Sequence, residues 1–315
     1  MGLNLFPELK SPILIVLITG LLFPWIVPFR SLGVEILIFA LAAVSCNILL
    51  GYTGLLSLGQ AALFAVGAYA TGLISIHLNL SPLLSLLCGA IAGALIAFVI
   101  GIFSIQRLGI YFIMLTLAFN QLVFFIAYEW VGLTGGDNGL LDIPRPPLFF
   151  GQGIHIDSVI SFYYFVLLVF MVCFFVIQRI INSPFGQVLQ AVRENEDRAW
   201  TVGFSIKRYK LTAFIISGFF TGIAGGLYAL FLQLVPINAV ELMTSAEILI
   251  MTLVGGTGSL YGPLIGSAVV KIFSEILSTL WSRWLLLLGI IYIIFIMFMK
   301  GGIWGLMQSV KNWSK

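Results

Sequence analysis

Residues 82–105 read PLLSLLCGAIAGALIAFVIGIFSI, a stretch of 24 residues without a single charged side chain. A bilayer core of about 30 Å takes roughly 20 apolar residues in helical form, so this stretch is long enough to cross it. In lipid the backbone amide and carbonyl groups have no water to bond, and a helix lets them bond one another. The stretch therefore predicts a transmembrane helix.

Similar apolar runs recur along the whole chain. They cover residues 12–29, 34–50, 61–78, 82–105, 108–128, 159–181, 211–233, 246–260, 262–280 and 284–300. We therefore expect an all-α, polytopic membrane protein of about ten transmembrane helices, forming one transmembrane domain over residues 1–315. The run at 246–260 is short and ends in Gly255-Gly256-Thr257-Gly258, which indicates a broken or partly inserted helix.

The composition agrees with a lipid environment. Of the 315 residues 61% are hydrophobic and 9% are charged, whereas soluble domains have roughly 25% charged residues. The three cysteines lie in apolar runs and the two histidines lie far apart, so no metal, redox or disulfide site is expected. The net charge of +3 gives no basis for a nucleic-acid partner.

The few charges are unevenly distributed. Nine of the 27 charges, six of them basic, lie between Arg179 and Lys210, whereas the loop at 129–158 has four acids and one base. Since cytoplasmic loops carry the excess of Lys and Arg, we expect the 182–210 loop in the cytoplasm and the 129–158 loop outside. If ten helices cross, both termini are cytoplasmic.

The 182–210 loop contains a short amphipathic segment. Ser183 and Pro184 are a typical N-cap and first helical residue, and Gly203 is suited to the position after a helix end. The apolar positions recur at three and four residues, which predicts one apolar face, formed by Phe185, Val188, Leu189 and Val192. The segment is either a solvated connector or a docking element for a cytoplasmic partner.

A second segment, residues 51–60, reads GYTGLLSLGQ and interrupts the apolar sequence with three glycines, one threonine and one serine. It is either a cytoplasmic turn or a broken helix, and broken helices line substrate sites in many transporters. Asn120 and Gln121 lie in the middle of a predicted span, where they either pack helices together or line the path along which the substrate crosses the membrane. The candidate path residues are Thr53, Ser57, Gly59, Gln60, Thr116, Asn120 and Gln121.

Ionisable side chains within the spans are few, which counts against an ion-coupled secondary transporter. Glu35 and Glu247 are expected near the ends of spans. Lys271 and Glu275, four residues apart, are expected to pair on one helix face. The spans contain no Ser/His or Asp/Asp pair of the kind that an intramembrane enzyme needs. Helix faces rich in small residues predict close helix packing; they include Gly67, Gly93, Gly218 and Gly222.

Four spaced motifs resemble one family. They are Gly51-Tyr52-Thr53-Gly54 through Ala62, Thr134-Gly135-Gly136 through Arg145, Ser183-Pro184-Phe185-Gly186 through Gly203, and Gly255-Gly256-Thr257-Gly258 through Pro263, followed by Gly302-Ile303-Trp304-Gly305-Leu306. In this order they are similar to the permease subunit of bacterial branched-chain amino acid ABC importers, of the LivM type. Thr257 and Lys300 depart from the usual pattern of that family.

The resemblance implies an inner-membrane importer for leucine, isoleucine and valine, with urea or amides as alternative cargo. The chain has no phosphate-binding G-x-x-x-x-G-K-[ST] loop, so we expect a separate ATPase subunit to use the ATP and no cofactor to bind this chain. A second homologous permease and a periplasmic binding protein are also implied. In the family the cytoplasmic element contacts the ATPase, which here assigns that role to Ser183, Phe185, Gly186, Leu189, Ala191, Arg193, Glu194, Glu196, Ala199 and Gly203. The apolar face is expected to seat in a groove of the ATPase, with Arg193, Glu194 and Glu196 at its rim.

Overall fold

The computed structural model describes residues 30–305, except 79, 108, 146–157, 281–282, 284–285, 288, 291 and 294–300. Over these residues the chain is all-α, and its only extended pairing is an isolated antiparallel bridge between Leu140 and Val235. The elements are α2 (Arg30–Asn47), the π-helix η1 (Ile48–Thr53), α3 (Gln60–Leu78), α4 (Pro82–Ser104), α5 (Ile110–Glu129), α6 (Val131–Thr134), the 3-10 helix η2 (Gly136–Asn138), α7 (Val159–Ile181), α8 (Pro184–Glu194), α9 (Glu196–Thr201), α10 (Ile206–Leu232), the 3-10 helix η3 (Ile237–Val240), α11 (Leu242–Gly255) and α12 (Gly262–Leu280).

Six of the described helices are long and apolar enough to cross a membrane: α2 with η1, α3, α4, α5, α7 and α10. The chain is therefore a multi-pass membrane protein. The count of about ten crossing helices is not confirmed, because the run at 12–29 and most of the run at 284–300 lie outside the described residues.

The predicted short helix before Gly255 is confirmed. Helix α11 has 14 residues, and at 1.5 Å per residue it is about 21 Å long. This length falls short of the bilayer core of about 30 Å.

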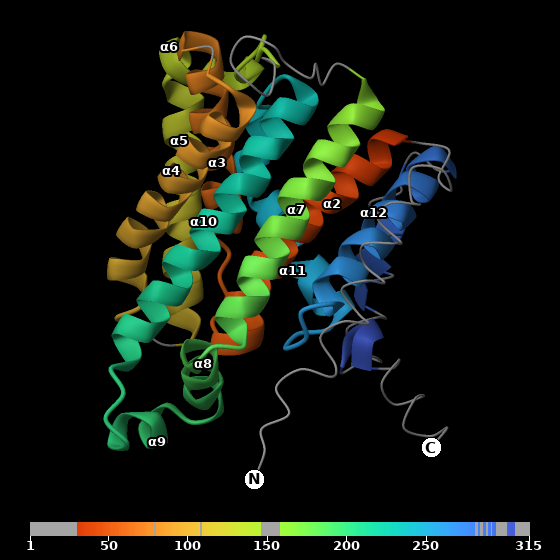
Figure 1. Ribbon diagram of the computed structural model, residues 1–315. Coiled ribbons are helices and arrows are strands. Elements are labelled where there is room, and N and C mark those ends of the chain that lie inside the picture. The colour runs from red at the N-terminus through yellow and green to blue at the C-terminus, as the bar shows by residue number, and fades with distance from the viewer. Residues whose placement is uncertain are drawn as a thin grey trace.

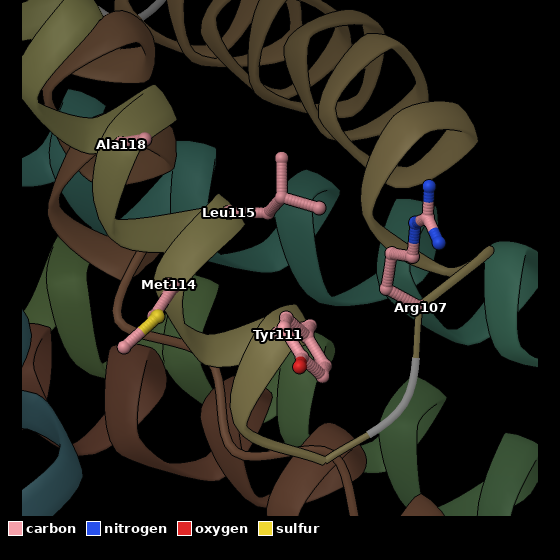
Figure 2. Close-up of a pocket in the computed structure, with 5 residues that line it drawn as sticks. All are labelled: Arg107, Tyr111, Met114, Leu115 and Ala118. Carbon is pink, nitrogen blue, oxygen red and sulfur yellow. The ribbon is translucent and has the colours of Figure 1, made fainter.

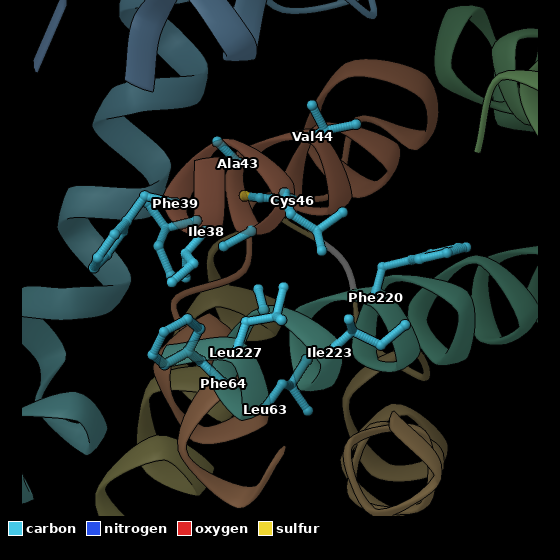
Figure 3. Packing of buried hydrophobic residues seen from close by; sticks show 14 of the residues in the cluster. Ile38, Phe39, Ala43, Val44, Cys46, Leu63, Phe64, Phe220, Ile223 and Leu227 are labelled. Carbon is cyan, nitrogen blue, oxygen red and sulfur yellow. The ribbon is translucent and has the colours of Figure 1, made fainter. Parts of the chain in front are cut away.

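Helix α2 lies at the centre of the molecule and joins its two sides. It contacts α7 and α10, and it also packs on α11 and α12 (Figure 1). Its side chains are almost entirely buried. Figure 3 shows Ile38 and Phe39 of α2 packed with Phe64 of α3 and Leu227 of α10. The apolar core is therefore built by α2, α3 and α10 together.

Close glycine contacts hold α3, α4 and α10 together. A Cβ atom on Gly67 of α3 would lie 2.3 Å from the carbonyl oxygen of Gly222 in α10. A Cβ atom on Gly93 of α4 would lie 2.5 Å from the carbonyl oxygen of Gly218. Helices in lipid gain their packing energy from such close backbone approach, so the predicted packing role of the small-residue faces is confirmed.

The two loops singled out by their charges lie at opposite ends of the bundle. Helices α8 and α9 lie at one end, and α6 lies at the other, separated by the length of α7 (Figure 1). This arrangement fits the prediction that the loops face opposite sides of the membrane. The predicted cytoplasmic location of the termini concerns residues outside the described part of the chain.

Candidate functional site

Helices α8 and α9 form the predicted amphipathic segment, but as two helices. The break is at Asn195, whose side-chain oxygen accepts a hydrogen bond from the amide of Arg198 at 2.9 Å. Gly203 follows α9 with a φ of +97°, as expected of a glycine after a helix end. Ser183 occupies the N-cap position of α8, yet its hydroxyl donates to the carbonyl of Ile180 at 2.6 Å instead of capping the helix.

The apolar face of α8 turns inward. Leu189 and Val192 are each 1% exposed, and Gly186 is buried where a Cβ atom would lie 2.0 Å from the carbonyl oxygen of Ile181. The prediction that Leu189 and Val192 seat in a partner's groove is therefore wrong. The physical reason is that helices of the chain itself cover this face. The amphipathic pattern of α8 therefore arises from its packing against the rest of the molecule.

The outer side of α8 borders an open groove with a volume of about 480 Å³. Phe185 stacks on Tyr209 of α10 with ring centroids 5.7 Å apart, and Phe204 meets the same ring edge-on at 5.9 Å. The residues that line the groove are Pro184, Phe185, Gln187, Val188, Ala191, Phe204 and Tyr209. Phe185 and Val188 are thus half-buried and remain accessible from this side.

An ion pair anchors α9 to the bundle. The ammonium of Lys210 in α10 donates to the carboxylate of Glu196 at the start of α9. Lys210 is 2% exposed, and a lysine at such a buried position needs a partner for its charge. Ala199 is also buried. The predicted rim residue Glu196 therefore holds α9 against α10.

Arg193 links α8 to the first glycine motif. Its guanidinium donates to the carbonyl of Gly51 in η1, and its side chain also passes close to Gly54. Gly54 ends η1 with a φ of +73°. Arg193 thus contacts the point where the helix formed by α2 and η1 breaks.

The two glycine motifs meet beside this contact. Asn47 donates to the carbonyl of Ser259 at 2.8 Å, and its oxygen accepts from the amide of Gly258 at 3.2 Å. A Cβ atom on Gly51 would lie 2.1 Å from the Asn47 oxygen and 2.7 Å from the Gly258 nitrogen. Only glycine fits at residue 51, and the segments 51–54 and 255–258 form one junction next to Arg193.

Most of the candidate path residues are buried in helix packing. Thr53 donates to the carbonyl of Leu49 at 2.6 Å. Ser57 is 1% exposed and accepts from the amide of Gly59 at 3.2 Å. Thr116 is buried and accepts from the amide of Leu58 at 3.2 Å. The bond between Leu58 and Thr116 holds the extended segment after η1 against α5, and the other two bonds are local.

Gln60 and Asn120 are fully buried and bonded at both ends of their amides. Gln60 bonds Ser217 and Thr221 of α10, in a network that also includes Ser45 of α2. Asn120 accepts from the amide of Ala62 at 2.8 Å and donates to the carbonyl of Val240 at 3.0 Å. The helix-packing interpretation of Asn120 is confirmed, and a role of these residues in a translocation path stays a prediction. The neighbouring Gln121 is exposed.

Charged groups also meet inside the bundle, which the sequence reasoning missed. The ammonium of Lys271 in α12 lies 2.7 Å from a carboxylate oxygen of Glu35 and 2.9 Å from one of Glu247. Glu275 is exposed, so the predicted pair of Lys271 with Glu275 is wrong. Glu35 and Glu247 are each the sixth residue of their helices, α2 and α11, which agrees with the expectation that they lie near span ends, but their shared partner was not predicted. Their partner lies on a helix distant in sequence, which spacing along one helix does not reveal.

The chain is similar to known transport proteins over most of its length. Residues 30–299 match the family described as "Branched-chain amino acid transport system / permease component". The chain is 28% identical to the high-affinity branched-chain amino acid transport system permease protein LivM of Salmonella typhimurium, over 89% of this chain and 71% of that protein.

Two archaeal proteins are also similar. The probable branched-chain amino acid transport permease protein LivM of Methanocaldococcus jannaschii is 26% identical over 76% of this chain and 79% of its own length. The probable permease protein LivH of the same organism is 31% identical over 31% of this chain and 30% of its own length. No solved structure matches the chain.

Proposed function

Because the chain belongs to the family of branched-chain amino acid transport system permease components, we propose that it is the LivM-type permease subunit of an ATP-binding-cassette importer. Its cargo is leucine, isoleucine and valine, the class of amino acid named for its LivM relatives. The single observation that carries the mechanism is the contact of Arg193 in α8 with the carbonyl of Gly51, where the central helix breaks.

A separate ATPase subunit binds the end of the bundle that carries α8 and α9. The groove on the outer side of α8 offers the half-buried Phe185 and Val188 to this partner. Arg193 and Glu194 are exposed beside it, and Trp200 of α9 is 71% exposed. Exposed aromatic and charged groups around an apolar groove are typical of protein interfaces. In this arrangement Leu189, Val192 and Ala199 support the docking surface from inside.

The junction next to α8 carries the ATPase's movement into the membrane. Arg193 holds the carbonyl of Gly51, and Asn47 holds the segment at Gly258 and Ser259. A displacement of α8 therefore shifts the extended segment that leads from Gly54 to α3. That segment is bonded to α5 through Thr116.

A second, homologous permease covers the outer face of α5. This helix is the least buried of the six spans, and its mid-span residue Gln121 is exposed. A polar side chain at membrane depth normally faces protein or a water-filled path, because lipid gives it no hydrogen bond. Toward the α8 end, the same face of α5 borders an open groove of about 510 Å³, beside Arg107, Tyr111 and Met114 (Figure 2).

The orientation of the chain in the membrane follows from the proposed contact of α8 with the ATPase. The α8 end faces the cytoplasm of a bacterial inner membrane, where the ATPase works, and the α6 end faces a periplasmic binding protein that delivers the cargo. The positive charges of the 182–210 loop support this orientation.

The variant Glu194→Lys tests this placement of the ATPase. Charge reversal at the exposed rim of α8 is expected to lower ATP-driven leucine uptake in membrane vesicles at least fivefold, while the amount of permease in the membrane stays normal. Glu194→Gln keeps the size of the side chain and serves as the matched control, with more than half of the uptake retained. Full uptake by Glu194→Lys, with the ATPase still co-purifying, would overturn the placement.

A further inference from the structure

Lys271, Glu35 and Glu247 bring three helices together inside the bundle. Lys271 comes from α12, Glu35 from α2 and Glu247 from α11, and the two distances from the ammonium are 2.7 and 2.9 Å. The ammonium is also 3.6 Å from the centre of the Phe39 ring. The Lys271 side chain is 10% exposed, and the side chains of Glu35 and Glu247 are 32% and 30% exposed. The two acids therefore occupy nearly equivalent positions around one base.

The triad lies far from the α8 end of the bundle, and Glu35 is the fifth residue of the span Ser31–Thr53. Glu35 precedes Asn47 by twelve residues on α2, which places it about 18 Å along the helix from the junction at the α8 end. Charged side chains within a membrane-spanning helix are rare, and in membrane proteins they commonly have a functional role.

Helix α11 connects two places that matter for transport. Near its start, Ser245 accepts a hydrogen bond from the amide of Ala61, at the beginning of α3, at 2.8 Å. Beyond its other end, Gly258 bonds Asn47 and lies beside the guanidinium of Arg193. Glu247 is two residues from Ser245 and so belongs to the same end of α11.

We propose that α11 is a rigid connector that carries the displacement of α8 to the start of α3, and that the pair of Lys271 with Glu247 fixes this connector to α12. Lys271 and Glu247 are positioning residues in this scheme. The inference rests on the proposed function, since it assumes that α8 is moved by an ATPase.

The triad contains its own control. Glu247→Gln frees α11 from Lys271 but leaves the pair of Lys271 with Glu35, whereas Glu35→Gln leaves the connector tied. Each variant removes one of two acids that have similar distances and similar exposure. A role in stability alone predicts similar effects of the two variants, and a role in positioning predicts a large difference.

The test uses the complete importer in proteoliposomes and measures leucine taken up per ATP hydrolysed. We expect Glu247→Gln to lower this ratio at least fivefold with ATP hydrolysis retained. Glu35→Gln, and Glu275→Gln on the exposed side of α12, are expected to stay within twofold of the unmodified complex. If the Glu247→Gln protein does not accumulate in the membrane, the same ratio is compared between the variants Glu247→Asp and Glu35→Asp. Lys271→Arg keeps both ion pairs, and its uptake per ATP hydrolysed is expected to exceed half of the value for the unmodified complex.

Equal ratios for the Glu247 and Glu35 variants would overturn the connector role while leaving the proposed function intact. Absence of ATP-driven leucine uptake by the unmodified complex would instead overturn the proposed function, and this inference with it.

Discussion

Replacing Arg193 by Ala removes the contact between α8 and the carbonyl of Gly51. A hydrogen bond from a charged donor contributes about 1.5–3 kcal/mol. Because Arg193 is exposed, water can replace part of this bond, and we take the lower limit of about 1.5 kcal/mol. This energy corresponds to roughly a tenfold change in an equilibrium. We therefore expect Arg193→Ala to reduce the fraction of ATPase cycles that move the membrane helices by roughly tenfold.

The assay is the ratio of leucine uptake to ATP hydrolysis by the reconstituted importer. Arg193→Ala is expected to lower this ratio while the complex still assembles and hydrolyses ATP, because the lost bond lies between two parts of the permease. Arg193→Lys keeps the charge and should give an intermediate ratio. Arg198→Ala, at an exposed arginine on α9, is the matched control and should leave the ratio unchanged. An unchanged ratio for Arg193→Ala, at normal levels of complex, would refute the reasoning.

Two further pairs of variants separate packing from transport. Asn120→Leu removes the bonds to Ala62 and Val240 and should destabilise the protein in detergent by about 1–3 kcal/mol. Gln121→Leu, on the exposed side of α5, should leave thermal unfolding unchanged but lower uptake, and equal unfolding of both variants would contradict this assignment. Gly67→Ala places a methyl group against the Gly222 carbonyl, which should cost about 1–3 kcal/mol. In Gly132→Ala the added methyl group has no neighbour within 4 Å, so unfolding should stay unchanged; equal stability of the two glycine variants would argue against close packing of α3 and α10.

Features that depend on neighbouring residues were predictable from the sequence. The helix at 82–105 was expected from its length and lack of charge, and α4 covers Pro82–Ser104. The small residues around Gly67 and Gly222 predicted close packing, because only small side chains permit backbones to approach in lipid. The shortness of α11, which has 14 residues, was indicated by the glycines that follow it.

Features that depend on distant residues were not predictable in the same way. The apolar pattern of α8 indicates a buried face, but it does not say whether the chain itself or a partner covers Leu189 and Val192. Lys271 has an acid four residues away, yet α12 turns its ammonium toward α2 and α11 instead. Likewise, the junction of Gly51 with Gly258 joins segments some 200 residues apart, and no local rule pairs them.

The most direct test of the central claim is the initial rate of leucine uptake into proteoliposomes that contain this chain with its ATPase, its second permease and its binding protein. The account predicts uptake that starts on addition of ATP, is inhibited by excess isoleucine or valine, and is unaffected by urea. Leucine uptake driven by an imposed sodium or proton gradient without ATP, or ATP-driven uptake of urea in place of leucine, would contradict it.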